Sequence, residues 1–266
     1  MSAPARLGSV PYLNARPLVA GLDEDPGVRL SEAPPSELAQ QLRAGRLDGA
    51  LCSAVELLRD PPLGWIGGPA IASRGAVASI RLFVRGEPRS VATLALDRSS
   101  LTASALAQVC LVEFLGAARP RVGACDPGAP LGSIDADAVL RIGDPALLTE
   151  GGERRVLDLG ELWTERTGLP FVWAVWLVGA ATPPGRLAAI RAAVLAARER
   201  GLARRDELAQ RFAAEQGLDP AFCRDYLRRT IHYDLGPEEH EGLVAFARLA
   251  HGHGLVDRPQ VPEPLA

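Results

Sequence analysis

The sequence of 266 residues contains no lysine, so arginine supplies all 29 of its basic side chains. This absence excludes Schiff-base catalysis and the phosphate-loop motif, because both need a lysine amine. Any bound anion must therefore be held by arginine, by hydroxyl groups or by backbone amides. The net charge of -3 and the pI near 5.9 also argue against a protein that neutralises nucleic-acid phosphates.

Cysteine and histidine are scarce, with four residues of each. The cysteines are scattered and form no CxxC pair, so we expect free thiols and neither a disulfide nor a zinc site. The histidines all fall near the C-terminus, where His251 and His253 fit a helix end better than a metal site. Motifs of nucleophilic hydrolases, zinc proteases, P-loop enzymes and dinucleotide-binding oxidoreductases are also missing.

Long hydrophobic runs are absent as well. The longest, residues 171–181, is far shorter than the roughly 20 residues that cross a bilayer. The first ten residues have neither the basic nor the apolar region of a secretion signal, so we expect a cytoplasmic protein. Hydrophobic residues at 47% and charged residues at 23% are typical of a globular protein with one large or two modest domains.

Short apolar runs alternate with segments of helical periodicity, which indicates an α/β protein with mostly parallel sheet. Residues 36–45 give the clearest helix, because Ser36 can cap its start and Gly45 can end it. Further helices are expected to begin at Asn14 and Ser53, and the proline-rich tail from Pro259 is expected to fray. The remaining predicted helices are 102–115, 145–149, 183–198, 206–216, 219–230 and 237–251, and the predicted strands are 7–10, 47–52, 91–96 and 138–142.

Two β-prone segments, residues 76–85 and 170–179, are longer than a typical strand. We interpret them as paired crossover strands that form a hinge between two lobes. The first lobe would comprise residues 1–84 and 178–266, and the second, inserted lobe would comprise residues 85–177.

Polar side chains gather where the first predicted strand ends. Tyr12, Asn14 and Arg16 stand where a helix is expected to begin, and the unpaired backbone N–H groups of a helix start favour anions. The same spacing also fits Asn14 as a helix cap alone. Ser53 similarly follows the strand over 47–52, at a strand-to-helix junction where ligands commonly bind.

The inserted lobe repeats this arrangement. Ser99, Ser100 and Thr102 follow another predicted strand, and their hydroxyls fit helix capping, carboxylate binding or both. Gly143 ends a third strand, where glycine permits close approach of another group. Asp144 is then either a helix cap or a carboxylate of the site.

Three other side chains have two readings each. Glu56 lies one turn into a predicted helix, so it either points back towards the cleft or lies exposed. Ser79 and Arg81 share one face of a predicted crossover strand, where they would meet a ligand between the lobes. Arg81 could instead pair with an acidic residue at the surface.

Several of these segments together resemble the chorismate dehydratase family (MqnA) of the futalosine route to menaquinone. The resemblance covers nearly the whole chain and implies the two-lobed fold of type II periplasmic binding proteins, used as a cytoplasmic enzyme. The sister family MqnD, which acts on cyclic dehypoxanthine futalosine, shares the fold but opens with a Ser-Pro-Cys-Pro-Asn-Asp segment. The opening Pro-Tyr-Leu-Asn of this chain favours the dehydratase. The matching segments are residues 10–18, 35–56, 96–102, 142–147 and 158–176.

The resemblance implies removal of water from chorismate to give 3-[(1-carboxyvinyl)oxy]benzoate, with no cofactor. Asn14 matches the Tyr-Leu-Asn position of the family, and a neutral amide cannot be a general base, so we assign it to binding and orientation. The base would be Glu56, Asp144 or the enolpyruvyl carboxylate of the substrate itself. We favour the substrate carboxylate, because no histidine lies in a matching segment.

Chorismate is a dicarboxylate, and the predicted donors for its carboxylates are hydroxyls beside helix starts. The family pattern Ser-Ser-Arg-Thr-Ser is altered over residues 99–103 of this chain, so Arg16 or Arg81 would compensate for the lost arginine. A non-catalytic protein that sequesters a small carboxylate would share the same fold. We expect no nucleic-acid or membrane partner. The hydroxyl donors are Ser53, Ser79, Ser100 and Thr102.

Overall fold

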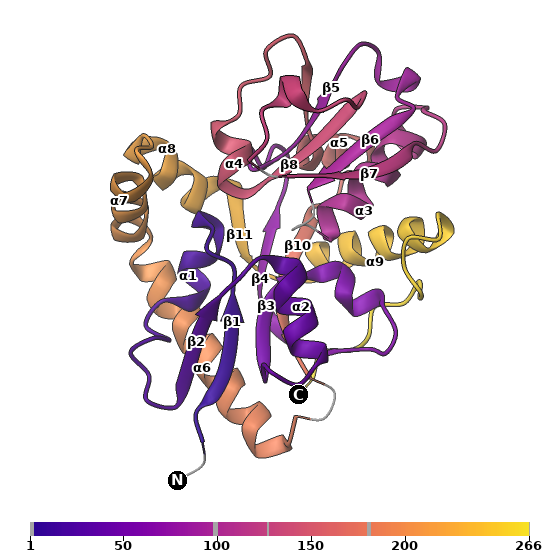
Figure 1. Ribbon diagram of the computed structural model, residues 1–266. Helices are drawn as coiled ribbons and strands as arrows, with labels where there is room; N and C mark the ends of the chain where they lie inside the picture. Colours follow the sequence, from indigo (N-terminus) through magenta and orange to yellow (C-terminus); the bar gives the residue numbers. More distant parts are fainter. Residues whose placement is uncertain (1–2, 98–100, 127, 180–181, 266) are drawn as a thin grey trace.

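The computed structural model describes residues 3–97, 101–126, 128–179 and 182–265 (Figure 1). Its strands form two separate sheets, which lie one above the other in Figure 1 with helices packed around each. The predicted α/β fold with two lobes is therefore confirmed.

The first sheet has six strands in the order β11-β4-β10-β3-β1-β2. Strand β1 pairs in parallel with β2 and β3, whereas β10 runs antiparallel to β3 and β4, and β11 runs antiparallel to β4. The strands are β1 (Ala5–Ser9), β2 (Val28–Glu32), β3 (Gly49–Ser53), β4 (Gly64–Ser73), β10 (Phe171–Val178) and β11 (Ile231–Asp234).

The second sheet has five strands in the order β7-β6-β8-β5-β9. Strand β6 is parallel to β7 and β8, and β5 is antiparallel to β8 and β9. The expectation of mostly parallel sheet was therefore wrong, because strands next to each passage between the sheets run against their neighbours. The strands are β5 (Ile80–Val84), β6 (Thr93–Asp97), β7 (Arg121–Cys125), β8 (Ala138–Ile142) and β9 (Arg155–Asp158).

Most helices follow the predicted periodic segments, but the helix over Leu159–Thr167 was not predicted. Helices α2 and α6 pack on the first sheet (Figure 1). Two predicted helices are continued by π-helical turns, over Cys110–Phe114 and Tyr226–Thr230. The helix expected at Ser53 is a 3-10 turn, Ala54–Leu58, and a shorter 3-10 turn, Leu13–Ala15, precedes α1. The helices are α1 (Arg16–Val19), α2 (Pro35–Arg43), α3 (Thr102–Val109), α4 (Gly143–Leu148), α5 (Leu159–Thr167), α6 (Pro184–Ala203), α7 (Arg205–Gln216), α8 (Pro220–Asp225) and α9 (Pro237–Gly252).

The chain passes between the sheets twice, and the predicted pairing of the two long segments was wrong. Strand β5 lies in the second sheet and β10 in the first, so they do not pair. A turn at Ala78, where φ is +62°, delays the start of β5 to Ile80. The Asp158 carboxylate accepts hydrogen bonds from the Val77 and Ala78 backbone and caps α5, so one side chain ties both passages together. The proposed lobe boundaries at 84/85 and 177/178 remain a prediction.

The hydrophobic core continues from one sheet to the other. Trp163 of α5 packs edge-to-face on Phe171 of β10 at 5.2 Å and on Phe246 of α9 at 6.3 Å. Helix α9 contacts β10 of the first sheet and also α3, which packs against β8 of the second sheet, so the last helix connects the two layers. Across the described residues, no helix is long and apolar enough to cross a membrane.

The C-terminal tail is ordered against the first sheet, which corrects the expectation that it frays. The Trp65 indole donates a hydrogen bond to the Pro262 carbonyl at 2.8 Å, and Leu265 forms a β-bridge with Ile66 of β4. The Leu265 side chain packs closely over Gly64, where a Cβ would lie only 2.4 Å from it.

Candidate active site

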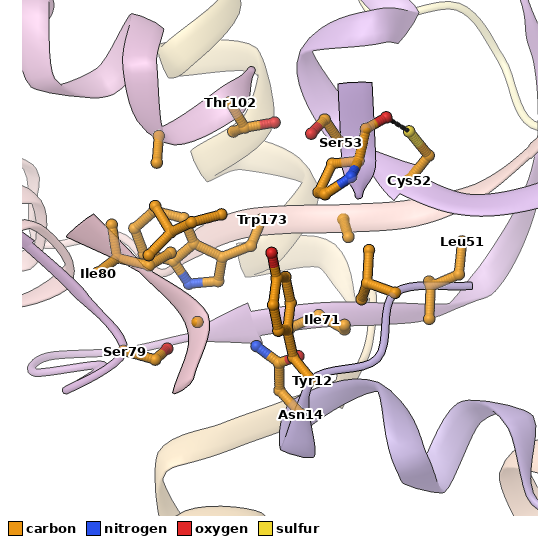
Figure 2. Close-up of a pocket in the computed structure, with 16 residues that line it drawn as sticks. Tyr12, Asn14, Leu51, Cys52, Ser53, Ile71, Ser79, Ile80, Thr102 and Trp173 are labelled. Carbon is orange, nitrogen blue, oxygen red and sulfur yellow. Dashed lines mark hydrogen bonds between the residues drawn. The ribbon is translucent and has the colours of Figure 1, made fainter. Parts of the chain in front are cut away.

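A pocket lies between the two sheets, where strand ends of both meet (Figure 2). It contains about 510 Å³ of open space, including its mouth. Apolar side chains make most of its wall, and hydroxyls and one amide supply its polar groups. The lining residues are Val10, Tyr12, Asn14, Pro35, Leu51, Cys52, Ser53, Ile71, Ser79, Ile80, Thr102, Ala103, Ile142, Gly143, Trp173 and Ala174.

Tyr12 and Gly143 touch each other across this pocket. Gly143 has a φ of +62°, and a Cβ at this position would lie 2.8 Å from Cε1 of Tyr12. Figure 2 shows the Tyr12 hydroxyl pointing into the pocket. Glycine thus permits both the left-handed backbone and the close approach of the ring.

Asn14, the only asparagine of the sequence, lies in the 3-10 turn after β1. Its Nδ2 donates to the Tyr226 hydroxyl at 3.4 Å, and that hydroxyl donates to Oγ of Ser79 at 2.7 Å. The Asn14 Oδ1 is buried and has no hydrogen-bond partner among the described residues. Leaving a buried acceptor unpaired costs about 1–3 kcal/mol, so this oxygen marks a place for a ligand donor.

Two buried hydroxyls lie on the other side of the pocket. Ser53 ends β3, and Thr102 begins α3 (Figure 2). The Thr102 Oγ1 accepts a hydrogen bond from the Val55 backbone at 3.1 Å, which links α3 to the 3-10 turn after β3. A hydroxyl that accepts in this way can still donate its own hydrogen to a ligand. Ser99 and Ser100 lie outside the described residues.

Asp144 lies beside the pocket and is not part of its lining. Its Oδ1 accepts a hydrogen bond from the Leu13 backbone at 3.5 Å, across the gap between the two halves, and it does not cap α4. Burial raises the pKa of Asp144 to about 6, although the Leu13 N–H and the charge of Arg16 act in the opposite direction. The carboxyl group therefore titrates close to neutral pH.

Glu56 does not reach the pocket. Its carboxylate is buried and forms ion pairs with Arg43 at 2.8 Å and with Arg59 at 3.3 Å. The segment Ala54–Leu58 forms a 3-10 turn and not the predicted regular helix, and this turn directs the Glu56 side chain to the two arginines. Glu56 is thus neither exposed nor directed at the cleft.

The two arginines expected at the site also lie elsewhere. Arg16 stands 5.9 Å from the centre of the Phe212 ring and 3.4 Å from Glu32. Arg81 donates to the Ala146 carbonyl at 3.3 Å and lines a separate hollow. Only Ser79 of the predicted pair reaches the pocket, because it precedes β5 and does not share a strand face with Arg81.

Sequence reasoning missed the apolar wall and the tyrosine behind Asn14. Trp173 of β10 lines the pocket and donates to Oγ of Ser73 at 3.0 Å. Its aromatic segment was predicted as a strand, but periodicity does not reveal which aromatic faces a ligand. Tyr226 gave no signal, because 212 residues separate it from Asn14.

This arrangement suits a small molecule with an apolar body and polar edges. The described lining residues include no arginine, histidine, aspartate or glutamate, so hydroxyls, one amide and backbone N–H groups would bind its polar groups. Within the described part of the chain, no group of histidine, cysteine or acidic residues could hold a metal ion.

Comparison with known proteins finds both a family and a named relative. The model of a family described as menaquinone biosynthesis matches residues 5–252. The chain is 35% identical over 262 residues to a protein of Thermus thermophilus named chorismate dehydratase, covering 92% of this chain and 94% of that protein.

Solved structures with low sequence identity share the fold. A protein of Archaeoglobus fulgidus superposes with a TM-score of 0.77 at 14% identity, covering 94% of this chain and 98% of that one. The alkanesulfonate-binding protein SsuA of Xanthomonas axonopodis pv. citri, bound to MOPS, gives 0.68 at 19% identity, with 98% and 96% covered. A Candida albicans protein described as having the generic periplasmic binding protein fold gives 0.67 at 9% identity, with 97% and 92% covered. The predicted periplasmic-binding-protein-like fold is therefore confirmed.

Proposed function

Because the chain belongs to the menaquinone biosynthesis family, we propose that it is an enzyme that dehydrates chorismate. The observation that carries this proposal is the identity with the Thermus thermophilus protein over nearly the whole chain. The pocket supports it independently, because its polar groups suit a small dicarboxylate with a ring hydroxyl.

The proposed reaction breaks one C–H and one C–O bond. Chorismate loses the ring proton at the carbon that bears the ether and the hydroxyl group at the neighbouring carbon. The electron pair of the C–H bond forms the new ring double bond, and the proton and hydroxide leave as water. The product, 3-[(1-carboxyvinyl)oxy]benzoate, has an aromatic ring, so aromatisation supplies the driving force. The balance needs no redox cofactor, and the enzyme would be a carbon–oxygen lyase of the hydro-lyase type.

We assign the two carboxylates of the substrate to hydroxyls at opposite sides of the pocket. Ser53 and Thr102 lie together on one side, and Thr102 stands at the start of α3, where backbone N–H groups favour an anion. Ser79 supplies a hydroxyl on the other side. Arg16 and Arg81 do not bind the substrate in this proposal, because both have partners outside the pocket.

The proton acceptor is the enolpyruvyl carboxylate of the substrate. This assignment fits a pocket whose described lining has no carboxylate or imidazole of its own. Asp144 is the second candidate, since a group with a pKa of about 6 is mostly ionised at neutral pH and lies next to Gly143. Glu56 is not a candidate in this geometry, because two arginines hold it outside the pocket.

We propose a cytoplasmic location for the enzyme. The four cysteines are all buried free thiols, which fits a reducing compartment. A small-molecule dicarboxylate would be its substrate.

The proposal is tested by incubating the purified chain with chorismate and following mass and ultraviolet absorbance. We expect an aromatic product that is lighter than chorismate by one water. Asn14→Ala should lower kcat by about 100-fold, because one lost orienting contact can cost that much. Gln41→Ala is the matched control, since its amide binds Glu37 on α2 outside the pocket.

Unchanged chorismate in the presence of folded protein would contradict the proposal. Calorimetric titration with chorismate would then separate a non-catalytic carboxylate-binding protein from an MqnD-like enzyme that needs a larger substrate. Within the proposal, Asp144→Asn tests the proton acceptor. Loss of turnover with normal chorismate affinity would show that Asp144, and not the substrate carboxylate, accepts the ring proton.

A further inference from the structure

The hydroxyl of Tyr226 bridges two polar side chains of the pocket without lining the pocket itself. Tyr226 is buried and begins the π-helical turn after α8, a kind of turn that is frequent at functional sites. Its hydroxyl lies 2.7 Å from Oγ of Ser79 and 3.4 Å from Nδ2 of Asn14.

The hydrogen bonds of the three side chains form one consistent set. A phenol has one hydrogen, and the short contact directs it to Ser79. The lone pairs of the oxygen then face Asn14 and can accept only from its NH2 group. The carbonyl end of the Asn14 amide is thereby turned away from Tyr226, which agrees with a buried Oδ1 that has no partner among the described residues.

We propose that Tyr226 is a positioning residue that holds the Asn14 amide with its oxygen towards the ligand, so that this position recognises a hydroxyl and disfavours a carboxylate. The inference rests on the proposed function, because the hydroxyl concerned would be the one that chorismate loses. An amide oxygen accepts from a hydroxyl, whereas it repels the oxygens of a carboxylate. With the amide reversed, the same residue would offer a donor and favour the wrong group.

Two further features support a fixed direction. Burial raises the pKa of Tyr226, so the phenol keeps its hydrogen throughout the neutral range. Ser79 accepts from Tyr226 and so directs its own hydroxyl hydrogen elsewhere, which suits donation to a carboxylate of the ligand. The bridge therefore sets one acceptor, Asn14, and one donor, Ser79, side by side.

The chain offers a matched control for Tyr226. Tyr233 is also buried, at 4% exposure against 2% for Tyr226. Its hydroxyl has no hydrogen-bond partner among the described residues. Tyr233→Phe thus removes a buried tyrosine hydroxyl without breaking the bridge.

The test compares two unreactive ligands as inhibitors of chorismate turnover: a ring-reduced chorismate analogue that keeps the hydroxyl, and the same analogue without it. We expect the unaltered chain and Tyr233→Phe to prefer the hydroxyl-bearing analogue by about tenfold, as for one buried hydrogen bond. Tyr226→Phe should bring the two inhibition constants within about twofold and lower kcat by about 10–100-fold. A purely structural role of Tyr226 would reduce the folded fraction and leave the ratio of inhibition constants unchanged.

Ser79→Ala provides a second variant if Tyr226→Phe does not fold. Without Ser79, the Tyr226 hydroxyl can donate to Asn14 and reverse its amide, so the preference should again disappear. Retention of the tenfold preference in either folded variant overturns the inference, and so does its absence from the unaltered chain. If the unaltered chain binds the analogues but leaves chorismate unchanged, the proposed function fails, and calorimetric affinities for the two analogues still decide the role of Tyr226.

Discussion

A methyl group at Gly143 should damage the pocket more than its small size suggests. The Cβ of Gly143→Ala would lie 2.8, 2.9 and 3.1 Å from three ring atoms of Tyr12. Ordinary contacts between carbon atoms are about 3.5–4.0 Å, so the ring must move by about 0.7 Å or more. The residue would also have to keep a φ of +62°, which costs a non-glycine residue about 1–2 kcal/mol.

These two effects can be separated with a matched glycine. Gly152 has a similar φ of +57°, but a Cβ there would meet nothing within 4 Å. Gly152→Ala should therefore lose about 1–2 kcal/mol of unfolding free energy and keep its turnover. Gly143→Ala should lose about 2–5 kcal/mol of unfolding free energy, because displacement of the ring adds overpacking of about 1–3 kcal/mol to the backbone strain.

Activity is the more informative measurement for this pair. A displacement of about 1 Å at a site can cost about 100-fold in rate, so we expect a loss of this order in chorismate turnover by Gly143→Ala. Urea denaturation gives the unfolding free energy of each variant, and steady-state kinetics gives the rate per folded molecule. Full turnover by Gly143→Ala, or equal losses in both variants, would refute the role assigned to the contact between Gly143 and Tyr12.

Three further changes test other parts of the structure. Burial raises the pKa of Asp144 to about 6, so the folded chain holds this proton more tightly than the unfolded chain. The resulting contribution to the unfolding free energy is complete below about pH 4 and is lost as the pH rises through 6. As the pH rises from 4 to 7, the unfolding free energy of Asp144→Asn should therefore increase by up to about 3 kcal/mol relative to that of the unaltered chain. A difference between the two chains in urea denaturation that stays constant over this range would contradict the burial argument. Glu56→Gln should lose about 2 kcal/mol of unfolding free energy, because it leaves Arg43 and Arg59 without their buried charged partner. The folded fraction of this variant should keep its kcat. A loss of kcat without a loss of stability would make Glu56 a catalytic candidate again. A chain ending at Arg258 should lose about 2 kcal/mol with the Trp65 hydrogen bond and the packing of Leu265, and an unchanged urea midpoint would show that the tail contributes nothing.

The sequence predicts best the elements whose apolar pattern is bounded by clear breaks. Strand β8 was predicted at its observed bounds, Ala138–Ile142, because a wholly buried run lies between Asp137 and Gly143. Helices α7 and α9 were predicted within one residue at each end for the same reason.

Edge strands escape this reasoning. Strands β2 and β7 are mostly exposed, so they lack an apolar run. Strand β4 lies inside the first sheet and escapes for another reason, because it contains Gly67, Gly68 and Pro69, which are typical of a loop. Irregularities in its pairing with β10 and β11 accommodate these residues, and such tertiary effects leave no local signal.

The candidate site follows a similar division. Strand ends bring Tyr12, Asn14, Ser53 and Gly143 together, because a helix start or turn follows each strand at the same edge of the molecule. The other contacts of the site join residues that are far apart in the sequence, so they could not be predicted from it. Nothing near Tyr226 in the sequence indicates that it reaches Asn14.

The most direct test of the account is a single-turnover measurement with chorismate and excess enzyme after dialysis against a chelator. The account predicts that the chain forms one aromatic product, lighter than chorismate by one water, and that Asn14→Ala slows this step about 100-fold while Gln41→Ala does not. Chorismate that binds but stays intact, or equal rates in the unaltered chain and Asn14→Ala, would contradict the claim that this pocket dehydrates chorismate.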